Sequence, residues 1–252
     1  MTAKRFAATV SYDGTEFVGS QTQPNGRTVQ QELERAAESI FGIPTHVELA
    51  GRTDSGVHAI GQVMALSAET QIEPHAVGRA LNARLPQDVA VRNVALVPAD
   101  FDPRRWARRR AYRYTIINGD ARDPLTRRTA WFIQGDLDTH AMQQAANALT
   151  GRQDFIACSG HLEPGRTSVR TVFKAEWQRS GNARLFEIEA DAFLPQMVRR
   201  IVGNLVRIGR GSANVEDFVR LLQQAEPGAL AYTAPAHGLC LQRVWYEEGY
   251  LE

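Results

Sequence analysis

The distribution of hydrophobic and polar positions predicts alternating strands and helices in the first hundred residues. The segment from Phe6 to Tyr12 has the character of a strand. A helix is predicted from about Val29 to Phe41, because Thr28 and Gln31 have the spacing of a capping box at its start. The other elements expected here are strands at 45–50, 61–67 and 89–97 and a helix at 75–84.

The second half of the chain shows the same two kinds of pattern. Bulky and polar residues alternate in part from Ala111 to Ile117, which predicts a strand, and Phe186, Ile188 and Ala190 alternate toward one face of a later strand. Ser180-Gly181-Asn182 separates two strand-like segments, 171–178 and 185–192, and predicts a hairpin turn. Helices are expected at 137–149 and 196–208.

These elements predict two domains with a boundary in an arginine-rich segment. Pro98 and Pro103 interrupt regular structure there. The expected domains are residues 1–105 and residues 106–252. Because strands and helices recur in each half without a repeat in the letters, the predicted fold class is α+β. We expect two similar mixed α/β domains with antiparallel sheets that form a central cleft.

Length and composition are those of a folded protein. The chain has 252 residues, of which 43% are hydrophobic, enough to bury a substantial core. No apolar run approaches a membrane-spanning length, and residues 1–4 lead into a strand without a signal-peptide core, so a cytoplasmic location is expected. Cys158 and Cys240 are too few for a disulfide scaffold or a metal site and are expected to be buried free thiols.

The charge balance points to a local basic patch, because the formal net charge is only +1. Of the 29 basic residues, only Lys4 and Lys174 are lysines. Guanidinium groups suit phosphate contacts and stacking on bases, which favours RNA as a partner. The alternative is a solvated linker with ordinary salt bridges. The clustered arginines are Arg104, Arg105, Arg108, Arg109 and Arg110, beside Trp106 and Tyr112.

The segment from Gly51 to Ala59 contains the candidate reactive group. Two glycines, Gly51 and Gly56, flank Asp54, and Arg52 lies two residues before it. Glycine allows backbone conformations closed to other residues, so Asp54 could be held at the tip of a tight connection facing a cleft. One alternative is an ordinary surface turn. Another is a metal pair formed by Asp54 and His58.

Six blocks of sequence resemble the tRNA pseudouridine synthase A (TruA) family. They occur in the family's order along nearly the whole chain. Two positions depart from the family pattern: Ser20, where members usually carry tryptophan, and Pro195-Gln196, where a polar pair is more usual. The blocks are Tyr12–Phe17, Thr28–Glu34, Gly51–Ala59, Arg110–Tyr114, Phe193–Arg199 and Ala234–Leu239.

The resemblance implies a pseudouridine synthase fold and a set of site residues. It implies that Asp54 is catalytic, that Tyr112 stacks against the target base and that Arg199 pairs with Asp54. Because the target base must be extracted from a folded arm, Arg52 is expected to fill or brace the gap that the base leaves. It also implies a cofactor-free homodimer that acts on the 3′ side of the tRNA anticodon stem-loop. From the residues alone, core packing remains open for Tyr112 and a solvent-facing position for Arg199.

The implied reaction breaks the glycosidic bond of uridine and rejoins uracil through carbon 5. Asp54 could act as a nucleophile or as a base, and the sequence leaves both open. His58, His161 and His237 are expected to be structural, since the reaction requires no imidazole. Two other functions remain: a non-catalytic tRNA-binding chaperone, and a metal-dependent hydrolase that uses Asp54 and His58.

Overall fold

The structure is a computed structural model that describes residues 3–159, 162, 165–247 and 250–251. The chain divides into two compact units. The first comprises Met1–Arg108 together with Leu241–Glu252, and the second comprises Arg109–Cys240. The division after Arg108 lies close to the expected boundary at residue 105. Residues 241–252 belong with the first unit, although the sequence places them in the second half.

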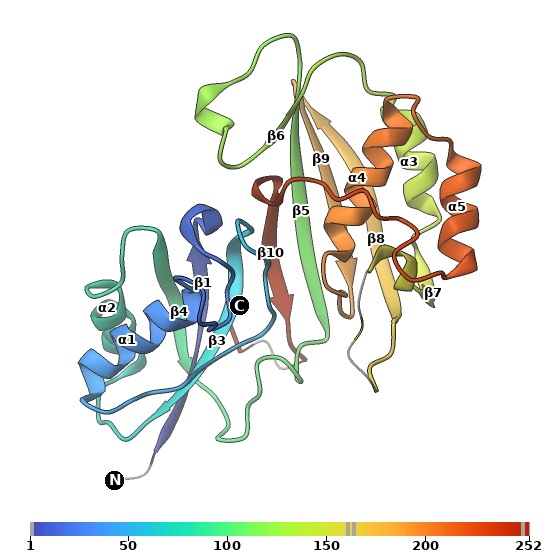
Figure 1. Ribbon diagram of the computed structural model, residues 1–252. Coiled ribbons are helices and arrows are strands. Elements are labelled where there is room, and N and C mark those ends of the chain that lie inside the picture. The colour runs from blue at the N-terminus through green and yellow to red at the C-terminus, as the bar shows by residue number, and fades with distance from the viewer. Residues whose placement is uncertain (1–2, 160–161, 163–164, 248–249, 252) are drawn as a thin grey trace. The chain divides into compact units, whose positions relative to one another are not determined.

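The first unit contains an antiparallel sheet (Figure 1). Its strand order is β4–β1–β3–β10, and β2 pairs with β3 off this path. Strand β1 is antiparallel to both β3 and β4, and β2 is antiparallel to β3. The strands are β1 (Lys4–Tyr12), β2 (Val47–Leu49), β3 (His58–Ala68), β4 (Val89–Leu96) and β10 (Leu239–Trp245), of which the residues from Leu241 onward belong to this unit.

Two helices supply core residues to this sheet, α1 (Val29–Phe41) and α2 (Pro74–Asn82). Leu33 of α1 and Leu81 of α2 are fully buried, as is Phe6 of β1. The predicted capping box is confirmed: the Thr28 side chain accepts the N–H of Gln31, and the Gln31 side chain accepts the N–H of Thr28. Two hydrogen bonds therefore fix where α1 begins.

The other face of the sheet is covered in part by residues of the arginine-rich segment and by Tyr246, Tyr250 and Leu251. Ala7 follows Phe6 on β1 and therefore points to the opposite face. Ala7, Ala65 and Phe101 form a buried cluster there, against which Trp106, Tyr246 and Tyr250 pack. The segment around Phe101 is therefore packed structure and not an extended linker.

The second unit has the strand order β5–β9–β8–β7, with β6 pairing parallel to β5. The pairs β5–β9, β8–β9 and β7–β8 are antiparallel. The predicted hairpin is confirmed, because β8 and β9 are joined through the Ser180↔Ala183 pair and Gly181 adopts φ 58°. The strands are β5 (Arg109–Asn118), β6 (Trp131–Ile133), β7 (Gly151–Asp154), β8 (Val169–Ser180) and β9 (Ala183–Ala190).

Three helices pack beside this second sheet: α3 (Thr139–Asn147), α4 (Met197–Gly209) and α5 (Val215–Gln224) (Figure 1). Helix α4 buries Ile201, Val202 and Leu205 completely. On β9, Phe186, Ile188 and Ala190 are all fully buried, as their alternation predicts. Helix α5 was not predicted from the sequence.

Both cysteines are thiols outside any disulfide. Cys158 is completely buried, and this burial raises the pKa of its thiol to about 12. Cys240 is only half-buried. No helix in the described residues is long and apolar enough to cross a membrane.

Candidate active site

Asp54 lies in the short connection between β2 and β3, as the sequence predicts. Gly56, two residues later, adopts φ 78°, a left-handed conformation that favours glycine. Its N–H donates to the Phe17 carbonyl at 3.3 Å, and the Val57 N–H donates to the Asp54 carbonyl at 3.1 Å. These two bonds close the turn that contains Asp54, and Asp54 is half-buried.

A second segment, from Asp13 to Ser20, supports this turn from the other side. Gly19 and Asp54 form an isolated antiparallel bridge. At Gly14 the two segments touch so closely that an added Cβ would lie 2.1 Å from the Val57 carbonyl oxygen. Only glycine fits at this position without moving the backbone that follows Asp54. The Tyr12–Phe17 and Gly51–Ala59 blocks therefore build one local structure.

Ser20 makes two hydrogen bonds to Thr53, the residue before Asp54. The Thr53 N–H donates to the Ser20 Oγ at 2.9 Å, and the Ser20 N–H donates to the Thr53 carbonyl at 3.2 Å. The Ser20 carbonyl accepts the N–H of Gln30 in the first turn of α1 at 2.9 Å. Tyr12 adds a bond between its hydroxyl and the Thr53 Oγ1 at 2.8 Å. Helix α1 and strand β1 thus both anchor the residue next to Asp54.

His58 has a structural position beneath the turn. It is buried, and its Nδ1 accepts the N–H of Gly14 at 3.0 Å, with Asp13 Oδ1 3.2 Å from the same nitrogen. Within the described part of the chain, no group of three or more His, Cys, Asp or Glu side chains could hold a metal ion. His161 lies outside the described residues.

Tyr112 and Tyr114 lie two apart on β5 in the second unit, and both are buried. The Tyr112 ring meets Phe193 edge-on, with centroids 5.1 Å apart. Tyr114 is completely buried, and its hydroxyl donates to the Pro235 carbonyl at 2.8 Å. Burial raises the pKa of this phenol well above its usual value. Tyr114 is therefore a core residue, whereas Tyr112 retains 8% exposure.

Arg199 lies in the first turn of α4, and its side chain is half-buried. Its Nε donates to the Ala234 carbonyl at 2.9 Å, and the Ala234 N–H donates to the Arg199 carbonyl at 3.0 Å. These bonds join the Phe193–Arg199 block to the Ala234–Leu239 block. The half-buried side chain does not match the solvent-facing alternative.

The structure thus sorts the predicted site residues by unit. Asp54 and Arg52 belong to the first unit, where Arg52 is exposed, and Tyr112 and Arg199 belong to the second. The roles of Ser20 and Thr53 were missed by sequence reasoning. Ser20 stood out only as a departure from the family pattern, and no local pattern reveals that it bonds to a residue 33 positions away.

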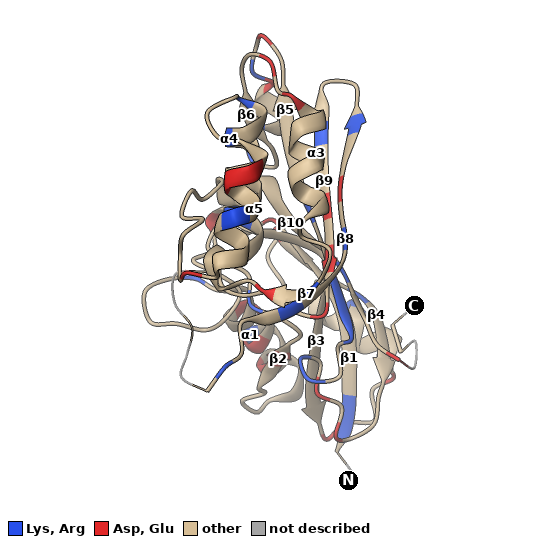
Figure 2. Ribbon diagram, turned by 90° about the vertical axis from the view of Figure 1, so that its right-hand side faces the viewer, with Lys and Arg blue, Asp and Glu red and all other residues tan. Residues whose placement is uncertain are grey.

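The clustered arginines are largely engaged with carboxylates. Arg105 lies 3.5 Å from Asp102, Arg108 lies 2.9 Å from Glu247, and Arg109 lies 3.2 Å from Glu189. Basic and acidic positions also neighbour one another elsewhere, as on α5 (Figure 2). This pairing favours ordinary salt bridges over a dedicated phosphate-binding strip, although the segment is packed and is not the solvated linker of that alternative.

Comparison with known proteins identifies the class. The tRNA pseudouridine synthase family model matches residues 8–104 and 145–247. The tRNA pseudouridine synthase A of Geobacter sp. (strain M21) is 40% identical over 240 residues, covering 95% of this chain and 97% of its own. The enzyme of the same name from Myxococcus xanthus is 41% identical, covering 97% and 93%. That from Shouchella clausii (strain KSM-K16) is 42% identical, covering 96% and 93%.

A chain of the solved Cbf5-Nop10-Gar1 complex also matches, with 12% identity and a TM-score of 0.37, covering 96% of this chain and 60% of that chain. The matches to the family model and to the curated relatives extend over both units. The chain therefore belongs to the tRNA pseudouridine synthase family. Its fold is the pseudouridine synthase fold, and it is an isomerase acting on uridine in tRNA.

Proposed function

We propose that this chain converts uridine to pseudouridine on the 3′ side of the tRNA anticodon stem-loop, with Asp54 as the catalytic residue and without a cofactor. The observation that carries the proposal is the construction of the Asp54 turn. Asp54 is half-buried and follows Thr53, whose N–H and carbonyl group both bond to Ser20. A rigidly held reactive group reduces the entropic part of the barrier.

The reaction balances with one carboxylate and no external reagent. The bond between ribose C1′ and uracil N1 breaks, the bond between C1′ and C5 forms, C5 loses its hydrogen and N1 gains one. Asp54 acts in this sequence either as a nucleophile or as a base toward the sugar. Both roles require the ionised carboxylate. The half-buried position keeps one side of Asp54 accessible to a nucleoside.

Tyr112, Arg199 and Arg52 are proposed to hold the substrate. Tyr112 meets Phe193 edge-on, an arrangement in which one aromatic ring orients another. The ring so oriented could stack on a base. Arg199 has its Nε fixed by Ala234, which sets the direction of its guanidinium group. Arg52 is exposed on the Asp54 turn, where it could fill the space left when the target base leaves the stack. The pairing of Arg199 with Asp54 stays a prediction.

The proposed form of the enzyme is a cytoplasmic homodimer that binds the anticodon stem-loop. This part rests on the resemblance to the family. A metal-dependent hydrolase based on Asp54 and His58 is less favoured, because His58 Nδ1 already accepts the Gly14 N–H.

The test is to map pseudouridine in an unmodified tRNA transcript after incubation with wild type, Asp54→Asn and Asp102→Asn. Wild type and Asp102→Asn should modify uridines on the 3′ side of the anticodon stem-loop. Asp54→Asn should bind the transcript and yield no product. Asp102 is a matched control, because it lies in the same unit and its carboxylate accepts the Arg104 and Arg105 N–H groups. Product with Asp54→Asn would refute the catalytic assignment, and modification elsewhere in the tRNA would refute the position.

A further inference from the structure

Gln62 is a fully buried amide in a row of apolar positions on β3. Met64 and Leu66, on the same face of the strand, are also fully buried, and so is Val10, which pairs with Gln62 on β1. Burying an amide costs free energy unless its polar atoms are hydrogen-bonded. A glutamine at this position therefore needs partners inside the unit, and these partners show what it holds in place.

The Gln62 side chain continues the pairing of β2 with β3 beyond the last backbone bond. In that bond the Ala50 N–H donates to the Val63 carbonyl at 2.8 Å. One residue further, the Gln62 Nε2 donates to the Gly51 carbonyl at 2.9 Å. The amide thus holds the first residue of the turn that contains Asp54.

The same amide lies beside the Tyr12 hydroxyl, which is 3.5 Å from its Nε2. The Tyr12 hydroxyl also bonds to the Thr53 Oγ1 at 2.8 Å. Gly51 and Thr53 are therefore both held from inside the unit. Arg52 lies between them, and Asp54 follows directly. Buried contacts thus set the path of the backbone into Asp54.

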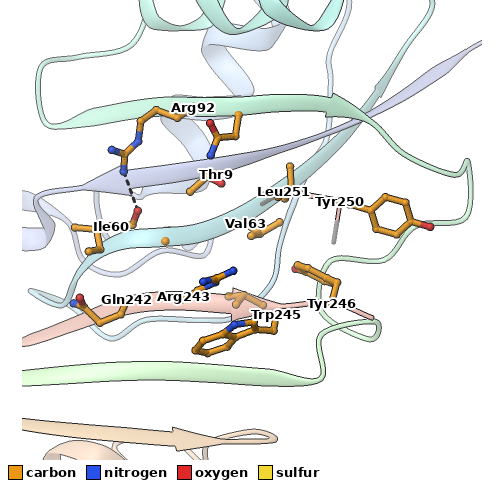
Figure 3. Close-up of a pocket in the computed structure, with 13 residues that line it drawn as sticks. Thr9, Ile60, Val63, Arg92, Gln242, Arg243, Trp245, Tyr246, Tyr250 and Leu251 are labelled. Atoms are coloured by element: carbon orange, nitrogen blue, oxygen red, sulfur yellow. Dashed lines mark hydrogen bonds between the residues drawn. The ribbon is translucent and has the colours of Figure 1, made fainter. Parts of the chain in front are cut away.

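A β-bulge directly before Gln62 sets the position of this amide. Between the pairs that Ala59 and Gln62 make with β1, β3 has one residue more than β1. The Ile60 carbonyl in the bulge accepts a hydrogen bond from the Arg92 Nη2 of β4 at 3.0 Å (Figure 3). At Gly61, an added Cβ would collide with a carbonyl oxygen of β10. Contacts with β4 and β10 therefore fix the bulge, and with it the place of Gln62 on β3.

We propose that Gln62 is a positioning residue for the isomerisation. It acts on Asp54 through the two contacts of its amide, with the Gly51 carbonyl and with the Tyr12 hydroxyl. The proposal rests on the proposed function, because it takes Asp54 as the reacting group. A displacement of about 1 Å at a reactive group can cost on the order of 10²-fold in rate. Without the amide, the backbone before Asp54 would be free to make such a displacement.

The experiment compares Gln62→Met with wild type and with Gln143→Met, because methionine has nearly the length of glutamine and no amide. Gln143 of α3 is the matched control. Its Nε2 donates to the Ala175 carbonyl at 3.2 Å and its Oε1 accepts the Trp177 N–H at 2.7 Å, all in the second unit. Gln62→Met should lower kcat for pseudouridine formation roughly ten-fold and leave KM for tRNA near that of wild type. Gln143→Met should change neither.

Tyr12→Phe is a second variant, for the case in which Gln62→Met does not fold. It keeps the buried ring and removes only the hydroxyl that contacts both Gln62 and Thr53. Its kcat should fall several-fold with KM unchanged, because the bond to Gly51 remains. Where Gln62→Met does not fold, a wild-type kcat in Tyr12→Phe overturns the proposal.

Hydrogen exchange gives a second readout that does not depend on activity. The Thr53 N–H donates to the Ser20 Oγ at 2.9 Å, and the Gly56 N–H donates to the Phe17 carbonyl at 3.3 Å. In Gln62→Met these two amides should exchange several-fold faster relative to the amides of the β1–β4 ladder. In Gln143→Met they should keep their wild-type rates.

Three results with folded Gln62→Met would overturn the proposal. One is a kcat equal to that of Gln143→Met. The second is a raised KM with unchanged kcat, which would assign Gln62 to tRNA binding. The third is an equal rise in exchange throughout the first unit, which would mean that Gln62 stabilises the unit as a whole. If wild type forms no pseudouridine, the proposed function fails, and the exchange rates still test whether Gln62 holds the Asp54 turn.

Discussion

Ser20 is the residue at which this chain departs most informatively from its family pattern. Its side chain is completely buried, and both its Oγ and its N–H bond to Thr53. Its carbonyl is bonded to Gln30 of α1. We infer that in this chain Ser20 positions the Asp54 turn from inside the protein, acting through Thr53 and not by touching RNA.

Replacing Ser20 by alanine should therefore affect turnover more than binding. The buried Thr53 N–H would lose its acceptor, which costs about 1–3 kcal/mol in the free energy of unfolding. The loosened Asp54 turn should lower kcat by roughly ten-fold, because small displacements of a reactive group are costly. KM for tRNA should stay near that of wild type. Steady-state kinetics and thermal unfolding measure both effects.

Ser39→Ala is a suitable control for this prediction. Its hydroxyl bonds to the Ala36 carbonyl within α1, and it is exposed. It should change neither kcat nor KM. A raised KM with unchanged kcat in Ser20→Ala would show that Ser20 acts on RNA binding instead.

Among the elements of the second unit, β5, β9 and β8 are joined by a row of charged side chains. Glu187 on β9 accepts from Arg113 on β5 at 2.7 Å and from Lys174 on β8 at 2.8 Å. The hydrogen bond from Lys174 is the largest cause that lowers the pKa of the Glu187 carboxyl below its usual 4.5, and the bond from Arg113 is the second. One carboxylate therefore links three neighbouring strands.

This row predicts a pH-dependent contribution to stability. A carboxyl whose pKa is lowered by folding stabilises the protein above its ordinary pKa of about 4.5, and this stabilisation is lost as the pH falls through the lower folded value. Glu187→Gln should lower the free energy of unfolding at pH 7 by about 1 kcal/mol, since the carboxylate is partly exposed. The difference from wild type should shrink below about pH 4.

Urea unfolding of both proteins at pH 7 and at pH 3.5 measures this difference. Glu176→Gln is the control, because its more exposed carboxylate lies 3.4 Å from the same Lys174. Its effect at pH 7 should be smaller. A Glu187→Gln difference that is equal at both pH values would contradict an electrostatic origin.

The elements that sequence predicted best are those with local signals. The Thr28–Gln31 capping box and the Ser180-Gly181-Asn182 turn involve residues at most three apart, and both are present. The helix expected from residue 196 begins at Met197. By contrast, β10 and β6 were not predicted. Strand β10 pairs with β3, which is far away in the sequence. Strand β6 has only three residues, too few to show a hydrophobic pattern.

At the scale of the whole molecule, the family-like blocks sort into two groups. Three of them, containing Tyr12, Thr28 and Asp54, fold together in the first unit. The other three meet in the second unit through the Tyr112–Phe193, Tyr114–Pro235 and Arg199–Ala234 contacts. The sequence identified the blocks, but only the folded chain reveals which blocks touch. Contacts such as Tyr114 to Pro235 depend on long-range packing that no local pattern encodes.

The central claim is that Asp54 isomerises uridine in tRNA, and release of tritium from C5-labelled uridine in tRNA tests it most directly. C5 loses its hydrogen only when the new bond to C1′ forms. Wild type should release tritium with or without a metal chelator, and Asp54→Ala should release none while still binding tRNA. Tight binding by wild type without release would contradict the account and favour a tRNA-binding chaperone. Release that is abolished by the chelator would contradict the metal-free mechanism.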